Sequence, residues 1–192
     1  RNAFSLKGSN AALTELERCT QTYLDIEQQS GRKEPKEMLM GNPPPDFEVG
    51  YRNDSSELLM TELVPIGQSV QDWSQMITIQ GLIDYRPETL ESFARSVTQL
   101  VIDECSDSNQ EILQRDKQFG YEFIVIGIAC FENLQTNLPE FLFVKAIQGD
   151  DALYVVQKAW RYEPSDNELE EWGRELEMFF VCGKNNNYSF CN

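Results

Sequence analysis

The stretch EFLFVKAIQGDDALYVVQKAWRY, from Glu140 to Tyr162, decides the fold class. Two runs rich in apolar and aromatic residues, Glu140–Gln148 and Leu153–Tyr162, flank Gly149-Asp150-Asp151. Glycine and aspartate are typical of tight turns, so the pattern predicts a β-hairpin. Strands that are joined by a short hairpin are antiparallel, and the sheet around this stretch is therefore expected to be antiparallel.

Further strands are expected on the N-terminal side of the hairpin. The continuous apolar run within Tyr121–Phe131 predicts a strand that is buried on both faces. Apolar and polar residues alternate in three earlier segments, which predicts strands at Phe47–Tyr51, Glu57–Val64 and Met76–Leu82. A short helix is expected between the last two of these strands, at Ser69–Gln75, with Ser69 as its N-cap.

Two longer helices are expected among the strands. Pro87 suits a first helical turn and opens a segment with an apolar stripe at helical spacing. Ser165 and Glu168 have the spacing of a capping box, which predicts that the last helix begins there. The segment Ser106–Lys117 is polar, and its apolar residues follow neither the spacing of a helix nor that of a strand. The predicted class is α+β, an antiparallel sheet of about six strands with helices packed on it.

The N-terminal part has a different pattern. Apolar residues at helical spacing predict a helix over Asn10–Gln29, and the charged, then proline-rich segment Arg32–Asp46 is expected to be a linker. We therefore expect an N-terminal helical arm over residues 1–39 and a single α+β domain over residues 40–192 with a disulfide-closed C-terminal tail. Arg1–Asn10 lacks the apolar core of a signal peptide, so we expect such a signal to be absent or already removed.

The composition excludes several classes of function. The chain of 192 residues has 16 Lys and Arg against 32 Asp and Glu, which gives a net charge of −16, and it contains no histidine. This charge disfavours nucleic acids and anionic lipid, because both bind clustered cations. The absence of histidine excludes Ser-His-Asp and Cys-His catalysis and histidine-ligated metals. No apolar run is long enough to span a bilayer.

The chain contains five cysteines: Cys19, Cys105, Cys130, Cys182 and Cys191. Cys182 and Cys191 flank a polar, asparagine-rich loop, which predicts a disulfide that closes the C-terminal tail. Cys105 and Cys130 could form a second bond, which leaves Cys19 unpaired. The alternative is five reduced thiols in a cytosolic protein, but the pattern favours an oxidising compartment.

Carboxylates are the candidate catalytic groups. Asp103-Glu104 and Asp150-Asp151 are adjacent pairs, and paired carboxylates can hydrolyse glycosides or hold a divalent cation. The expected hairpin turn is enough to explain Asp150-Asp151, however. Five glutamates of the last predicted helix flank an apolar stripe, as on a solvated helix face: Glu168, Glu170, Glu171, Glu175 and Glu177.

Lys145 and Lys158 lie on the two strands of the predicted hairpin. They could bind an anion together, but we interpret them as two solvated lysines on an open sheet face. No nucleophile elbow, glycine-rich phosphate loop or zinc-ligand spacing is present. We therefore expect no catalytic residue, no cofactor, no metal and no enzymatic activity.

Several strings between Met40 and Cys182 carry a family resemblance: Gly50-Tyr51, Glu62–Pro65, Asp72–Gln80 (DWSQMITIQ), Phe143–Gly149 (FVKAIQG) and Tyr154–Pro164 (YVVQKAWRYEP). In these strings the chain resembles a group of uncharacterised bacterial exported proteins. The resemblance implies a secreted or periplasmic protein with paired cysteines near Cys105 and Cys130. The order of the predicted elements is also similar to that of the Mog1/PsbP-type sandwich. The group has no established activity, so no catalytic residue is carried over.

These observations favour a non-catalytic protein-binding module of the bacterial envelope, with a basic protein as the expected partner. The alternative among binding proteins is an acidic immunity protein or an inhibitor of a basic toxin or hydrolase. The alternative from another class is a carboxylate-dependent hydrolase, which requires two carboxylates to converge in one cleft.

Overall fold

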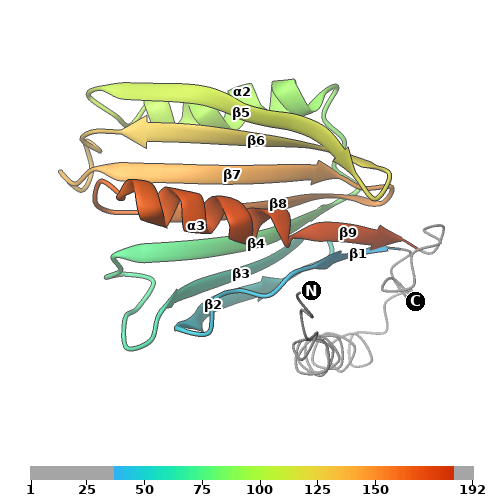
Figure 1. Ribbon diagram of the computed structural model, residues 1–192, viewed down its shortest axis with the longest axis horizontal. Coiled ribbons are helices and arrows are strands. Elements are labelled where there is room, and N and C mark those ends of the chain that lie inside the picture. The colour runs from blue at the N-terminus through green and yellow to red at the C-terminus, as the bar shows by residue number, and fades with distance from the viewer. Residues whose placement is uncertain (1–36, 184–192) are drawn as a thin grey trace, which may run out of the picture. The chain divides into compact units, whose positions relative to one another are not determined.

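The computed structural model describes residues 37–183, which form a seven-stranded antiparallel sheet, a two-stranded sheet and two helices (Figure 1). The strand order of the large sheet is β2-β3-β4-β8-β7-β6-β5, and β1 pairs with β9. The elements, in chain order, are β1 (Glu37–Met40), β2 (Phe47–Asp54), β3 (Leu58–Pro65), β4 (Gln75–Ile83), α2 (Leu90–Ile102), β5 (Ser108–Gln118), β6 (Tyr121–Cys130), β7 (Glu140–Gln148), β8 (Ala152–Trp160), α3 (Asp166–Glu177) and β9 (Phe180–Gly183). The predicted α+β class is confirmed. The predicted helix Asn10–Gln29 lies outside the described residues, as do Cys19 and Cys191.

A helix packs on each face of the large sheet (Figure 1). β8 lies between β4 and β7, so its side chains alternate between two covered faces. Phe93 and Ala94 of α2 pack in the core on one face, and Trp172 and Leu176 of α3 pack in the core on the other. The two cores explain why the hairpin β7–β8, whose turn was predicted at Gly149-Asp150-Asp151, is apolar almost throughout.

Capping residues fix where the two helices begin. The Thr89 side chain accepts a hydrogen bond from the backbone N–H of Ser92, and the Ser92 side chain accepts one from the backbone N–H of Thr89. Ser165 and Glu168 form the predicted capping box at the start of α3. Because Thr89 supplies the capping oxygen, α2 begins at Leu90, three residues later than the predicted start at Pro87.

Two segments differ from their predicted structure. Ser69–Gln75 is not a helix, because Ser69 and Asp72 pair in a tight turn and Gln75 already belongs to β4. A helix of about seven residues gains little against the cost of nucleation. The polar segment Ser106–Lys117 forms most of β5, one of the two edge strands of the large sheet. Most of β5 is exposed and it contains a bulge at Leu113, so no apolar period marks it as a strand.

The small sheet joins the two ends of the described chain, with Glu37 opposite Gly183. The sequence pattern predicts neither of its strands, and β1 crosses the predicted boundary between residues 1–39 and 40–192. Glu37 is only 3% exposed. Its carboxylate accepts hydrogen bonds from the backbone N–H groups of Asp150 (2.6 Å), Asp151 (2.8 Å) and Ala152 (3.1 Å). The Glu37 side chain of β1 therefore stabilises the turn between β7 and β8.

Two glycines make room for this contact. A Cβ atom at Gly149 would collide with the Glu37 carboxylate, and one at Gly183 would collide with the Tyr121 hydroxyl. Burial raises the pKa of Tyr121 to about 12, and the negative charges of Glu37 and Asp150 act in the same direction. The side chains around Glu37 are therefore closely packed, and a larger residue at either glycine would displace them.

A disulfide joins Cys105, which follows α2, to Cys130 at the end of β6. The bond ties the C-terminal end of α2 to the sheet, beside a backbone bridge between Cys105 and Asn133. Cys182 is also disulfide-bonded. The predicted bond from Cys182 to Cys191 stays a prediction, because Cys191 lies outside the described residues. Neither helix between residues 37 and 183 is long and apolar enough to cross a membrane.

Candidate functional site

Two buried lysines lie between the large sheet and α3. Lys145 on β7 is 2% exposed and Lys158 on β8 is 4% exposed. The interpretation of these residues as solvated lysines on an open sheet face is wrong, because α3 covers that face. The register pairs Lys145 with Val156 and Lys158 with Phe143, so the two lysines are diagonal neighbours and not a direct cross-strand pair.

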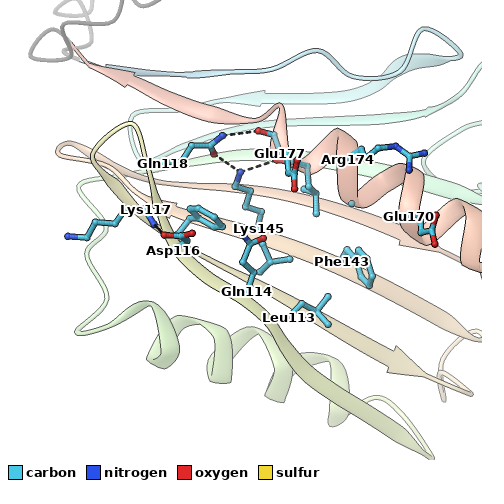
Figure 2. Close-up of a pocket in the computed structure, with 14 residues that line it drawn as sticks. Leu113, Gln114, Asp116, Lys117, Gln118, Phe143, Lys145, Glu170, Arg174 and Glu177 are labelled. Carbon is cyan, nitrogen blue, oxygen red and sulfur yellow. Dashed lines mark hydrogen bonds between the residues drawn. The ribbon is translucent and has the colours of Figure 1, made fainter.

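Lys145 anchors the C-terminal end of α3 to the sheet. Its ammonium group donates to the backbone carbonyls of Phe179 (2.7 Å) and Leu176 (3.0 Å) and to Oε1 of Gln118 (2.9 Å), as Figure 2 shows in part. It also lies 4.6 Å from the centre of the Phe123 ring. The last carbonyls of a helix lack hydrogen-bond donors within the helix, and they carry the negative end of its dipole. A buried ammonium group at this end supplies hydrogen bonds to the carbonyls and a positive charge next to the dipole.

Lys158 is surrounded by aromatic rings. Its ammonium group lies 4.1 Å from the ring centre of Phe47, 5.2 Å from that of Trp172 and 5.5 Å from that of Trp160. The negative faces of the rings attract the cation and partly replace its hydration. Four carboxylates, at Asp46, Glu168, Glu171 and Glu175, raise the pKa of Lys158, but burial lowers it by more.

We expect the free energy of unfolding to rise between pH 7 and pH 9. Burial lowers the pKa of Lys145 and of Lys158 from 10.5 to about 8. Above pH 8 the folded protein therefore releases protons that the unfolded chain still binds, and stability increases with pH. The expected gain is about 1 kcal/mol for each lysine over this interval, measured by urea denaturation at a series of pH values.

A matched variant separates the two lysines. Lys158→Met keeps an apolar side chain of similar length but removes the titration, so it should lose about half of the rise. Above pH 10 the trend should reverse, because burial raises the pKa of Tyr121 and of Tyr162 to about 12 in the folded protein. A stability that stays flat from pH 7 to pH 9 in the parent protein would contradict this account.

A groove with a volume of about 610 Å³ opens beside Lys145, between α3 and strands β5 to β7 (Figure 2). Its size lies in the range of small-ligand sites. Apolar side chains form its inner surface: Leu113, Phe123, Val125, Phe143 and Leu176. Leu113 is 45% exposed and therefore partly open to solvent.

The rim of the groove is acidic. Asp116 of β5 and Glu170 and Glu177 of α3 line it. The cations at the groove are directed elsewhere: Lys117 points outward and forms an ion pair with Glu122 (3.0 Å), and Arg174 points away from Leu113 (Figure 2). The Lys145 ammonium group donates its hydrogen bonds to Gln118 and to carbonyls at the C-terminal end of α3. A ligand in this groove therefore meets an apolar surface next to carboxylates.

The glutamates of α3 lie in two rows on either side of its apolar stripe. Each row has i, i+3, i+7 spacing, and a glycine occupies the middle position of the second row. One row acts on Lys158 through its negative charge: Glu168, Glu171 and Glu175. The other row lines the groove: Glu170, Gly173 and Glu177. The predicted solvated glutamate face thus has two distinct sides.

The other predicted carboxylates do not form a common site. Asp103-Glu104 are exposed residues beside the Cys105–Cys130 disulfide, near the first residue of β7, whereas Asp150-Asp151 follow its last residue. A strand of this length separates them by roughly 25 Å. A glycosidase needs its two carboxylates within about 5 to 10 Å of each other. Within residues 37–183, no three potential metal ligands gather to hold an ion.

Three residues that shape the groove were not predicted from the sequence: Leu113, Gln118 and Gly173. Leu113 lies in the polar segment that showed no strand pattern, and Gln118 lies just beyond it. Gly173 could have been noticed in the sequence, because it interrupts a predicted helix. A glycine in the interior of a helix lowers the stability of that helix.

The fold is similar to that of Mog1. The Ran-binding protein Mog1p of Saccharomyces cerevisiae matches 76% of this chain and 94% of its own with 15% sequence identity and a TM-score of 0.50. A point mutant of Mog1 matches 74% of this chain and 89% of its own, with 14% identity and a TM-score of 0.47. No protein-family model matches the chain, and a search of curated proteins found no match. The chain therefore has a Mog1-like fold, and the likeness extends to the fold alone.

Proposed function

We propose that the domain is a non-catalytic binding module of the bacterial envelope that takes a cationic protein partner along α3. The observation that carries the proposal is the charge of this helix, in which six of 12 residues are Asp or Glu and one, Arg174, is basic. The whole chain has a net charge of −16. A surface of one sign attracts and orients a partner of the opposite sign.

The location in the envelope is supported by the cysteines and by the sequence resemblance. Disulfides such as Cys105–Cys130 form and persist in oxidising compartments, which include the bacterial periplasm. The strings Phe143–Gly149 and Tyr154–Pro164 resemble those of bacterial exported proteins. A partner in the same compartment is the one that this acidic helix would meet.

Binding of a fluorescein-labelled oligolysine peptide tests the proposal. We expect anisotropy titrations to show binding at about 50 mM NaCl and its loss at about 500 mM, because salt screens exposed charges. The double variant Glu170→Lys/Glu171→Lys reverses two exposed charges on α3 and should weaken binding by about tenfold or more.

A control variant distinguishes the helix from the net charge. Glu57→Lys/Glu88→Lys changes the net charge by the same amount at two exposed positions outside α3 and should weaken binding less than about threefold. Circular dichroism checks that both variants fold. Equal losses in the two variants would mean that the peptide follows only the net charge, and the proposal would be rejected.

A further inference from the structure

The described residues 37–183 give no packing reason for a glycine at position 173. It lies in the interior of α3, where glycine costs about 1 kcal/mol relative to alanine. Among residues 37–183, a Cβ atom at Gly173 would have no atom within 4 Å apart from the adjacent residues and the nearby backbone of α3, whereas a Cβ at Gly149 or Gly183 would collide with a neighbour. The packing of the domain therefore does not require a glycine here, and its effect is to leave the groove open.

The bulge in β5 places an additional apolar side chain in the same groove. Ile112 pairs with Ile126 and Gln114 with Val125, so Leu113 is the extra residue of the bulge. Its side chain covers Gly127, where an added Cβ would lie 3.3 Å from Leu113 and 3.4 Å from Phe143. Bulges commonly redirect a side chain beside a functional site. Leu113 and Phe143 thus form an apolar surface that faces the gap over Gly173.

We infer that this groove binds a segment of the partner in which a bulky apolar side chain stands next to a lysine or arginine. The apolar side chain lies over Gly173 against Leu113 and Phe143, and the cation lies at the rim beside Glu170, which Figure 2 places at the same end of the groove as Phe143. This assignment rests on the proposed function and adds to it the requirement for an apolar anchor. Complementary charge brings the partner to the rim, and burial of the anchor in an apolar pocket supplies affinity.

Two labelled peptides of equal charge test the requirement for an anchor. In one, lysine alternates with leucine, and in the other, lysine alternates with serine. We expect the parent protein to bind the leucine peptide at least about tenfold more tightly, since burial of one leucine side chain contributes that much or more. The variant Gly173→Leu fills the groove and should bind both peptides with the weaker, salt-sensitive affinity of the serine peptide.

Two further variants separate occupancy of the groove from changes in the helix. Gly173→Ala adds only a Cβ and should keep the preference for leucine, with a helix of equal or greater stability. Asn167→Leu adds the same side chain as Gly173→Leu to an exposed position of α3 outside the groove and should also keep it. Loss of the preference in Asn167→Leu would assign it to another surface and overturn the inference.

The outcomes distinguish the inference from the proposed function. If the parent protein binds both peptides equally and the Glu170→Lys/Glu171→Lys variant binds neither, the groove has no anchor site but the proposed function stands. If the parent protein binds neither peptide at about 50 mM NaCl, the proposed function fails together with the inference.

Discussion

Replacement of Lys145 with alanine should lower the free energy of unfolding by about 2 to 4 kcal/mol. The change removes one donor to the carbonyls of Leu176 and Phe179 and to Gln118, although the Leu176 carbonyl keeps the backbone N–H of Phe179, and it leaves a cavity under α3. Relief of the buried charge offsets part of this loss, because burial already lowers the pKa of Lys145 to about 8. Urea denaturation at pH 7 measures the effect.

Lys145→Met is the control for this prediction, since methionine fills most of the cavity but donates no hydrogen bond. It should cost less than Lys145→Ala, and the difference between the two measures the apolar stem of the lysine. Both variants should weaken the attachment of α3 to the sheet more than the rest of the fold. The rate of amide hydrogen exchange should therefore increase more in α3 than in β6. A loss below about 1 kcal/mol in Lys145→Ala would show that the end of α3 is held by other contacts.

Removal of the Cys105–Cys130 disulfide should lower the free energy of unfolding by about 3 to 4 kcal/mol. The two cysteines are 25 residues apart in sequence, and the bond restricts the unfolded chain over that loop. The double variant Cys105→Ala/Cys130→Ala tests this more cleanly than a reducing agent, because Cys182 is disulfide-bonded as well. Urea denaturation without reductant gives the difference from the parent protein.

The same double variant has a structural readout. The disulfide holds the segment after α2 against the end of β6, so its loss should increase hydrogen exchange at the C-terminal end of α2 more than in α3. A single variant, Cys105→Ala, should destabilise to a similar extent because it also opens the loop. Unchanged stability in all of these variants would mean that the bond does not constrain the unfolded chain.

Local patterns were sufficient to predict the elements whose signals are contained in a short stretch. The hairpin around Gly149-Asp150-Asp151 and the capping box Ser165–Glu168 each depend on neighbouring residues, and both are present. β5 escaped prediction because an exposed edge strand needs no apolar period. The segment Ser69–Gln75 was misassigned because a serine before a few apolar residues fits both a short helix and a tight turn.

The site was largely inaccessible to sequence analysis, because its contacts join distant parts of the chain. Lys145 bonds to carbonyls 31 and 34 residues away, and Glu37 accepts an N–H from a residue 113 positions away. The mostly apolar pattern of β7 and β8 does not reveal that α3 covers their lysines. The exposed glutamates of α3 were predicted from the sequence. The sequence does not show that β5 lies opposite Gly173, and only this placement makes Gly173 part of a groove.

The pairing of β1 with β9 has a consequence for how such a domain can be combined with others. Glu37 and Gly183, the first and last described residues, are cross-strand neighbours, so both ends of the described segment lie side by side (Figure 1). A domain with adjoining ends can be placed within a surface loop of another protein without stretching that host. The pairing of β1 with β9 therefore gives residues 37–183 the geometry that such an insertion requires.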